Sequence, residues 1–271
     1  MAMDSKYDYD PFWAKCVEHK VAPTSHAGHQ GIGSNKSISS YVYNHIGSFA
    51  EANHAFCKAV FLGGVAKRFP DLKFGFLEGG VGWALSLLSD TIEHWEKRNK
   101  NAIGNYDPKA LDVEKLTEYF QQYGGKAIEG REDSFVEYLE GLKVDFEKAD
   151  EIDEFEACGC KTKDDIRAQF ENFFFGCEAD DKINSYAFQG PKERHLNAMF
   201  SSDISHWDVP DIRECVSEAH ELVEGGHMSD EDFEDFMFVN PARLHAGMNP
   251  DFFKGTRVEG EIETLKAAGR L

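Results

Sequence analysis

Residues 69–83, FPDLKFGFLEGGVGW, place a carboxylate and two glycines directly after a short apolar run. An unbroken apolar run is typical of a strand that is buried on both faces, as the strands of a parallel sheet are. Glu78, followed by Gly79 and Gly80, marks the point at which that strand ends in open backbone. The segment therefore predicts a buried strand whose carboxyl end carries a functional side chain.

Three other segments have the same character, an apolar run that ends in polar residues. They are KVAPTSHAG, which leads to His26 and His29, ENFFFGCEADD, and LNAMFSSDISHWD, which contains Asp203 and His206. A helical pattern over residues 48–69 separates the first strand from the second, and this order predicts parallel strands. Because the carboxyl ends of parallel strands share one face, we expect Glu78 and these polar side chains to meet at one pocket.

The middle of the chain differs in character from both ends. Residues 99–168 are acidic and interrupted by glycines, with helical patterns over residues 112–123 and 135–146. We interpret this stretch as a helical insertion, solvated on one face, within a single domain over residues 1–271. Two further segments close the chain, and Ser229 is predicted to cap a helix that begins after it.

Composition excludes several classes of partner. The net charge of -20, from 49 acidic and 29 basic residues, argues against nucleic acid, which requires a basic surface. No apolar run reaches the ~20 residues that span a bilayer, and the first residues are polar and acidic, unlike a signal peptide. The six scattered cysteines are interpreted as reduced thiols, so we expect a cytoplasmic protein. Its expected partner is a small-molecule substrate.

Histidine and carboxylate together indicate a metal site. They are the nitrogen and oxygen ligands that zinc, manganese and iron accept, and a bound divalent ion lowers the pKa of its water toward ~7. Taken singly, each residue also has a structural interpretation: His26 as a hydrogen-bonded histidine, Glu78 and Asp203 as caps of backbone amides. Trp207 either walls a substrate pocket or packs behind the last helix. The shared position at strand ends favours the functional interpretation.

The segments TSHAG, RFPDLKFGFLEGGVGW, AMFSSDISHWD and FVNPARLHAG occur in an order and at a spacing that resemble the second half of the amidohydrolase-related family, which includes the aminocarboxymuconate semialdehyde decarboxylase-like enzymes. The resemblance implies a metal-dependent (β/α)₈ barrel of the TIM type. It also implies that His26 and Asp203 bind the metal and that Asp203 moves a proton. Glu78 stands where many members have a catalytic histidine, so Asp203 and Glu78 are the predicted catalytic residues.

Further expectations concern the substrate and the ion. His29, His206 and Trp207 are predicted to contact the substrate. Zinc is the expected ion, with manganese or iron as alternatives. A further alternative is that the chain binds no metal, because the His-x-His pair of the family is absent from this sequence.

Only four strands can be recognised, whereas a closed barrel has eight and typically ~250 residues. We therefore predict the carboxyl-terminal half of a barrel, about four parallel strands with their helices. Its open edge requires a second copy of the chain, a separate front half, or a rearranged open sheet wrapped by the insertion. The function expected first is hydrolysis of an ester, lactone or amide, with non-oxidative decarboxylation or a non-catalytic truncated barrel as alternatives.

Overall fold

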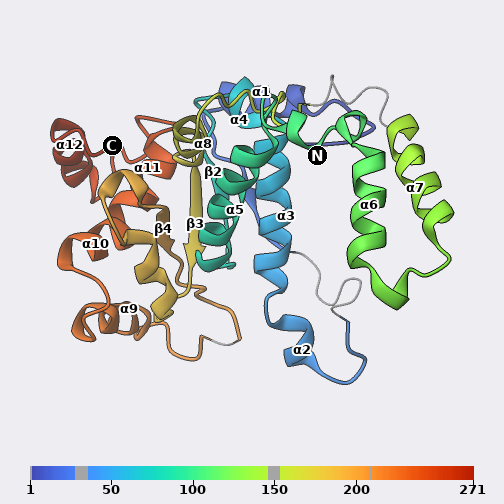
Figure 1. Ribbon diagram of the computed structural model, residues 1–271. Helices are drawn as coiled ribbons and strands as arrows, with labels where there is room; N and C mark the ends of the chain where they lie inside the picture. The colour runs from blue at the N-terminus through green and yellow to red at the C-terminus, as the bar shows by residue number, and fades with distance from the viewer. Residues whose placement is uncertain (1, 28–35, 146–152, 208) are drawn as a thin grey trace. The chain divides into compact units, whose positions relative to one another are not determined.

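The computed structural model describes residues 2–27, 36–145, 153–207 and 209–271 (Figure 1). The chain forms two compact units. The main unit combines Met1–Ile92 with Ala157–Leu271, and the second unit spans Glu93–Glu156. The predicted insertion, residues 99–168, overlaps the second unit, but its last residues belong to the main unit, where they form most of helix α8 (Lys163–Phe170).

The main unit contains a parallel sheet of four strands, which confirms the predicted α/β class and its four parallel strands. The strands are β1 (Thr24–Ser25), β2 (Phe74–Phe76), β3 (Phe173–Cys177) and β4 (Asn197–Phe200), and they lie in the order β1-β2-β3-β4. Figure 1 labels β2, β3 and β4. Every residue of β2 and β3 is buried, as the unbroken apolar runs predict. The sequential order brings all four carboxyl ends to one edge of the sheet.

One face of the sheet is an aromatic layer. The ring of Phe74 lies beside that of Phe173, with centroids 5.8 Å apart, and Phe76 stacks on Phe175 at 5.9 Å. Trp83 packs edge to face against Phe76 at 5.8 Å and against Phe175 at 5.4 Å. The parallel register, which pairs Phe74 with Phe173 and Phe76 with Phe175, aligns these rings. Helix α5 (Gly82–Arg98), which supplies Trp83, is therefore fixed against the strands that lead to the site.

The opposite face is covered by a side chain from the end of the chain. Phe174 and Met199 form a buried cluster with Leu244 of helix α11 (Asn240–Ala246). Gly75 leaves room for this helix, since a Cβ atom there would lie 3.4 Å from Leu244 Cδ2 and 3.2 Å from Thr24 Cγ2. Helix α11 thus covers part of this face of the sheet.

The main unit contains further helices and turns. They are α1 (Asp10–Glu18), α2 (Tyr41–His45), α3 (Ser48–Leu62), α4 (Val65–Arg68), α9 (Cys215–Glu224), α10 (Asp230–Glu234) and α12 (Glu259–Ala267), with 3-10 turns η5 (Lys182–Phe188) and η6 (Lys192–Arg194) and a π-helical turn η7 (Asp235–Val239). Ser229 caps α10 as predicted, because its side chain accepts a hydrogen bond from the Asp232 N–H. The helix predicted over residues 48–69 is broken in two at Gly63 and Gly64, where Gly64 has a φ of 71°.

The second unit is helical. Its elements are η1 (Ile103–Tyr106), η2 (Pro108–Ala110), α6 (Val113–Tyr123), η3 (Gly125–Ala127) and α7 (Glu132–Asp145). The two helices predicted over residues 112–123 and 135–146 correspond to α6 and α7, and Phe120 stacks on Phe135 between them at 3.9 Å. Arg98 donates two hydrogen bonds, of 2.6 and 2.7 Å, to the Glu154 carboxylate, which joins the two ends of this unit.

Two findings concern membrane spans and the thiols. Among the helices of the described residues, none is both long and apolar enough to cross a bilayer. All six cysteines are buried, and none of them forms a disulfide. Buried thiols of this kind behave as small apolar side chains.

Candidate functional site

Glu78 and Asp203 stand just beyond the ends of β2 and β4, in backbone conformations that side chains rarely adopt. Glu78 has a φ of 59° and Asp203 a φ of 47°, and Ser205 follows with 84°. Within the described residues, five residues other than glycine have a positive φ, and these three are at the site. Each such residue costs about 1–2 kcal/mol, and strain of this kind is typical of functional sites.

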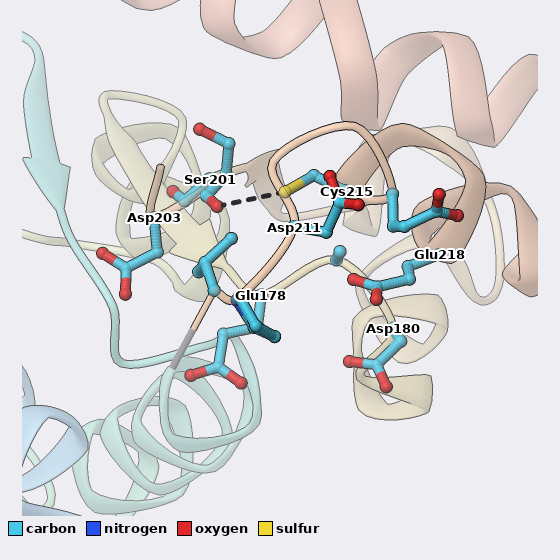
Figure 2. Close-up of a pocket in the computed structure, with 12 residues that line it drawn as sticks. Glu178, Asp180, Ser201, Asp203, Asp211, Cys215 and Glu218 are labelled. Atoms are coloured by element: carbon cyan, nitrogen blue, oxygen red, sulfur yellow. Dashed lines mark hydrogen bonds between the residues drawn. The ribbon is translucent and has the colours of Figure 1, made fainter. Parts of the chain in front are cut away.

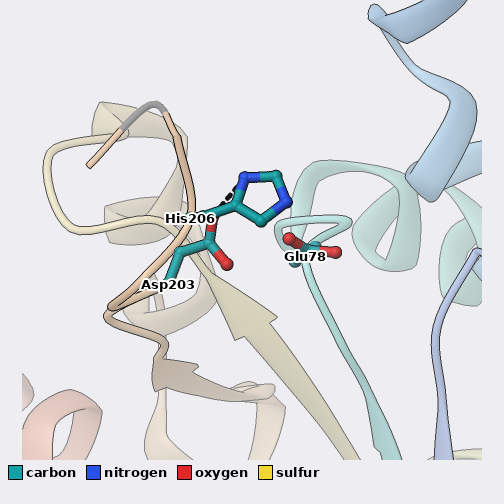
Figure 3. Close-up of side chains that lie close together, drawn as sticks. All are labelled: Glu78, Asp203 and His206. Atoms are coloured by element: carbon teal, nitrogen blue, oxygen red, sulfur yellow. Dashed lines mark ion pairs between the residues drawn. The ribbon is translucent and has the colours of Figure 1, made fainter. Parts of the chain in front are cut away.

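The side chains of Glu78, Asp203 and His206 point toward one another (Figure 3). One ligand atom from each of the three lies within 4.8 Å of the other two. His206 Nδ1 is 3.3 Å from Asp203 Oδ2, and these residues are three apart in the loop after β4. Glu78 and Asp203 are half-buried, whereas His206 is exposed, so the cluster opens to solvent on one side.

His26 joins this cluster from the end of β1. Its Nε2 atom forms an ion pair with Glu78 Oε2, although the two atoms do not meet the geometry of a hydrogen bond. The His26 ring also packs edge to face against Phe49 of α3, with centroids 5.4 Å apart. The predicted metal ligands His26 and Asp203 and the predicted catalytic Glu78 therefore lie together, contributed by three strand ends.

The environment of Glu78 changes its acidity. Burial raises the pKa of the Glu78 carboxyl above its usual value, and this is the largest effect. The neighbouring Asp203 carboxyl raises the Glu78 pKa further, whereas His26 and, to a smaller extent, His206 lower it. Two carboxylates that lie close together repel each other, and this favours the protonated form of one of them.

The residues predicted to contact substrate are distributed unequally. His206 lies within the cluster, and His29 is outside the described residues. Trp207 is 69% exposed, and its ring packs edge to face against that of Tyr41 in α2 at 5.9 Å. Trp207 therefore lies on the exposed side of the cluster, with its ring centroid 6.4 Å from that of His206.

A cavity of about 290 Å³ adjoins the cluster and shares Asp203 with it (Figure 2). Figure 2 shows Asp203 and Glu178 on one side of this space, with Glu218 and Asp180 on the other. None of the described residues in its wall is basic. Six of them carry carboxylates: Glu178, Asp180, Asp203, Asp211, Glu214 and Glu218. A cavity with this lining attracts cations and repels anions.

Glu178, Asp180 and Asp203 follow predicted strands, but sequence analysis missed Asp211, Glu214 and Glu218, because residues 208–226 have the pattern of one amphipathic helix with a proline at its start. Helix α9 instead begins at Cys215. The Asp211 carboxylate accepts hydrogen bonds from the Arg213 backbone N–H at 3.0 Å and from its guanidinium, which stabilises a turn before the helix. The turn places Asp211 in the cavity wall, where a helical spacing would not predict it.

Asn53 in α3 was also missed. It is fully buried, and its side-chain amide donates a hydrogen bond of 2.7 Å to the carbonyl oxygen of Leu77, the residue before Glu78. The sequence signal was available, because a single asparagine among the apolar residues of a helix face requires a partner for its amide.

Neither a family model nor a curated protein sequence matches the chain. The chemistry of the site therefore rests on its own residues. Glu78, Asp203 and His206 provide the donor atoms that zinc binds at about 2.0–2.2 Å, and their span of 4.8 Å is slightly more than twice that distance, while His26 reaches the group through its ion pair with Glu78. A small closure of these side chains would fit a divalent ion, so the donor set is compatible with a metal site.

Proposed function

We propose that the chain is a metal-dependent hydrolase that resembles the amidohydrolase-related family and cleaves an ester, a lactone or an amide. The observation that carries this proposal is the convergence of His26, Glu78, Asp203 and His206 from the ends of three parallel strands. The backbone strain at Glu78 and Asp203 supports it, because these conformations cost stability and have no role in the hydrophobic core.

The residues divide the chemistry among them. Zinc, or manganese or iron in its place, would be held by His26, Asp203 and Glu78 with His206 beside them. When bound, such an ion polarises a carbonyl group and lowers the pKa of a water molecule. Asp203 would accept the proton of the attacking water, since its carboxylate reaches both the cluster and the cavity. His206, 3.3 Å from Asp203 Oδ2, would hold that carboxylate in position and face the substrate.

The cavity favours hydrolysis over the alternative of non-oxidative decarboxylation. A decarboxylase must bind a substrate carboxylate, and a wall of six carboxylates, of which Asp211 is paired with Arg213, would repel one. Glu78 adds to this effect, because it offers a hydrogen-bond acceptor where a histidine could donate. A neutral or cationic carbonyl compound is therefore the substrate class that the site suits best.

The proposal extends to the fold. Four parallel strands in sequential order wind as half of a TIM-type barrel does. A closed barrel would need a second copy or a separate front half along β1. Leu244 covers Phe174 and Met199 on the inner face, which favours an open half-barrel that is stable without either. Light scattering distinguishes a monomer from a paired assembly.

The test is a rate measurement on the zinc-loaded protein with a panel of neutral and cationic esters, lactones and amides. Asp203→Asn should lower kcat by at least about 100-fold, the usual contribution of an acid-base group. Asp71→Asn is the matched control, because Asp71 is exposed and precedes β2 at the other end of the strand. If no compound of the panel is hydrolysed, or if both variants hydrolyse the panel at the wild-type rate, the hydrolase proposal is wrong. The alternative of a non-catalytic chain is then favoured.

A further inference from the structure

Asn53 holds the backbone immediately before Glu78. Its side chain is 0% exposed, and Nδ2 donates to the Leu77 carbonyl oxygen over 2.7 Å. A carbonyl oxygen can only accept, so the amide nitrogen must face Leu77. The contact joins helix α3 to the residue that follows β2, 24 positions later in the chain.

The backbone after Glu78 is held just as closely. A Cβ atom on Gly79 would lie 2.9 Å from Trp83 Nε1, 3.0 Å from Asn53 Nδ2 and 3.3 Å from the Ala50 Cα atom. Only glycine fits against α3 and α5 at this distance. Glu78 therefore lies between a hydrogen-bonded carbonyl on one side and a tightly packed glycine on the other, with its own φ at 59°.

Stability alone does not explain an asparagine at this position. Its Oδ1 atom is buried and accepts no hydrogen bond within the described part of the chain. Burying such an atom costs free energy, whereas an apolar residue of similar size would fill the same space without that cost. What the amide supplies, and an apolar residue cannot, is a fixed position for the Leu77 carbonyl.

We propose that Asn53 is a positioning residue: by fixing the Leu77 carbonyl it keeps Glu78 in its left-handed conformation, with the carboxylate turned toward His26, Asp203 and His206. This inference rests on the proposed function, because its consequence is a preformed ligand for the metal ion. Groups that orient a metal ligand in this way usually change metal affinity by 10–100-fold when they are removed.

Asn184 in η5 is a matched control. It is also 0% exposed, its Nδ2 donates to the Glu178 carbonyl oxygen over 2.8 Å, and its Oδ1 is likewise buried without a hydrogen bond from a described residue. It thus makes the same bond after β3 that Asn53 makes after β2. Glu178 lines the cavity but is outside the cluster of ligand atoms, so Asn184→Ala removes an equal bond without reaching that cluster.

The experiment titrates zinc into metal-free protein against a chromogenic chelator. We expect Asn53→Ala to bind zinc 10–100-fold more weakly than the wild type, and Asn184→Ala to stay within about twofold. In the Glu78→Gln background, Asn53→Ala should have no further effect, because the residue acts through Glu78. Two results would overturn the inference while leaving the hydrolase proposal intact. One is equal zinc affinity for the wild type and Asn53→Ala. The other is a fall in zinc affinity on Asn53→Ala that is as large in the Glu78→Gln background as in the wild type.

A second readout separates the two proposals. If the wild type binds no zinc, the proposed function fails, and the inference is then decided by crystal structures of the metal-free Asn53 and Asn184 variants. Glu78 should leave the positive-φ region in the Asn53 variant alone, and an unchanged Glu78 would refute the positioning role. Asn53→Leu, which keeps approximately the size of the side chain but removes the donor, replaces Asn53→Ala if that variant does not fold.

Discussion

Glu78 and Asp203 bring a carboxylate oxygen each to within 4.8 Å of one another, although they follow β2 and β4, two strands that are separated in the sheet by β3. Neither residue reaches the other through local sequence, and both do so from a strained backbone with a positive φ. Two half-buried acidic groups this close together destabilise the protein unless a cation or a proton lies between them. The pairing is therefore the relationship from which the predictions about this site follow.

The first prediction concerns pH. Because burial and Asp203 raise the Glu78 pKa in the folded protein, the folded state holds this proton more tightly than the unfolded state does. The stability that the proton supplies is fully present below the usual glutamate pKa of about 4.3, and it is lost as the pH rises through the higher folded value. The glutamine of Glu78→Gln stays neutral at every pH. Without metal, the variant and the wild type should therefore have about equal free energies of unfolding near pH 4, and the variant should be the more stable of the two near pH 7.

Urea denaturation at both pH values, in the presence of a chelator, measures this difference. Glu51→Gln in α3 provides the control, since it removes the same charge from an exposed helical position and should show no such divergence. A Glu78→Gln variant that loses stability relative to the wild type as the pH rises would show that the Glu78 carboxylate is stabilised in the fold, contrary to this account.

The second prediction concerns substrate charge. For esters of equal leaving group, the acidic cavity should favour a cationic acyl or alcohol portion over an anionic one in kcat/KM. Each wall carboxylate contributes about 1 kcal/mol at 4 Å in water, or about fivefold. Asp211→Asn and Glu218→Gln should each reduce the preference for cationic over anionic esters by a few fold. Salt at about 0.5 M should also reduce this preference, because it screens the wall carboxylates. Anionic esters that react as fast as cationic ones would exclude this cavity as the substrate site.

The third prediction concerns the sheet that supports the site. Phe175 is completely buried, stacked on Phe76 and packed against Trp83. Phe175→Ala should lower the free energy of unfolding by about 3–5 kcal/mol, and Phe175→Leu by much less, because leucine leaves a smaller cavity. Tyr186→Ala, at a 55% exposed ring, should stay within about 0.5–1 kcal/mol of the wild type. Denaturant titrations compare them, and equal losses at both aromatic positions would contradict this description of the core.

The sequence predicts the strands well because their signal is local. The runs around Phe74, Phe174 and Ala198 are apolar on both faces, and a parallel sheet of four strands follows from them together with the helical pattern between the first two. The grouping of His26, Glu78 and Asp203 could also be predicted, because parallel strands present their carboxyl ends at one edge. Only two residues of the first strand form the ladder, Thr24 and Ser25, since Pro23 lacks the N–H that would extend it.

The rest depends on contacts between distant segments. The position of the break at Gly63 and Gly64 follows from a close approach of the Ala157 carbonyl oxygen, which would lie 2.2 Å from a Cβ atom on Gly64. The hydrogen bond from Asn53 to Leu77 joins residues 24 positions apart, and no pattern of spacing indicates it. Likewise, Asp211 enters the cavity through a turn that Arg213 stabilises, where the periodicity indicates a helix.

The central claim is that His26, Glu78, Asp203 and His206 hold one divalent ion. Elemental analysis after zinc loading and removal of excess metal tests this most directly, on the wild type, Asp203→Asn, Glu78→Gln and the control Asp71→Asn. The account predicts about one zinc ion per chain for the wild type and the control, and a large loss of bound zinc in both site variants. A wild type that retains no stoichiometric zinc, manganese or iron, or site variants that retain as much zinc as the control, would contradict it.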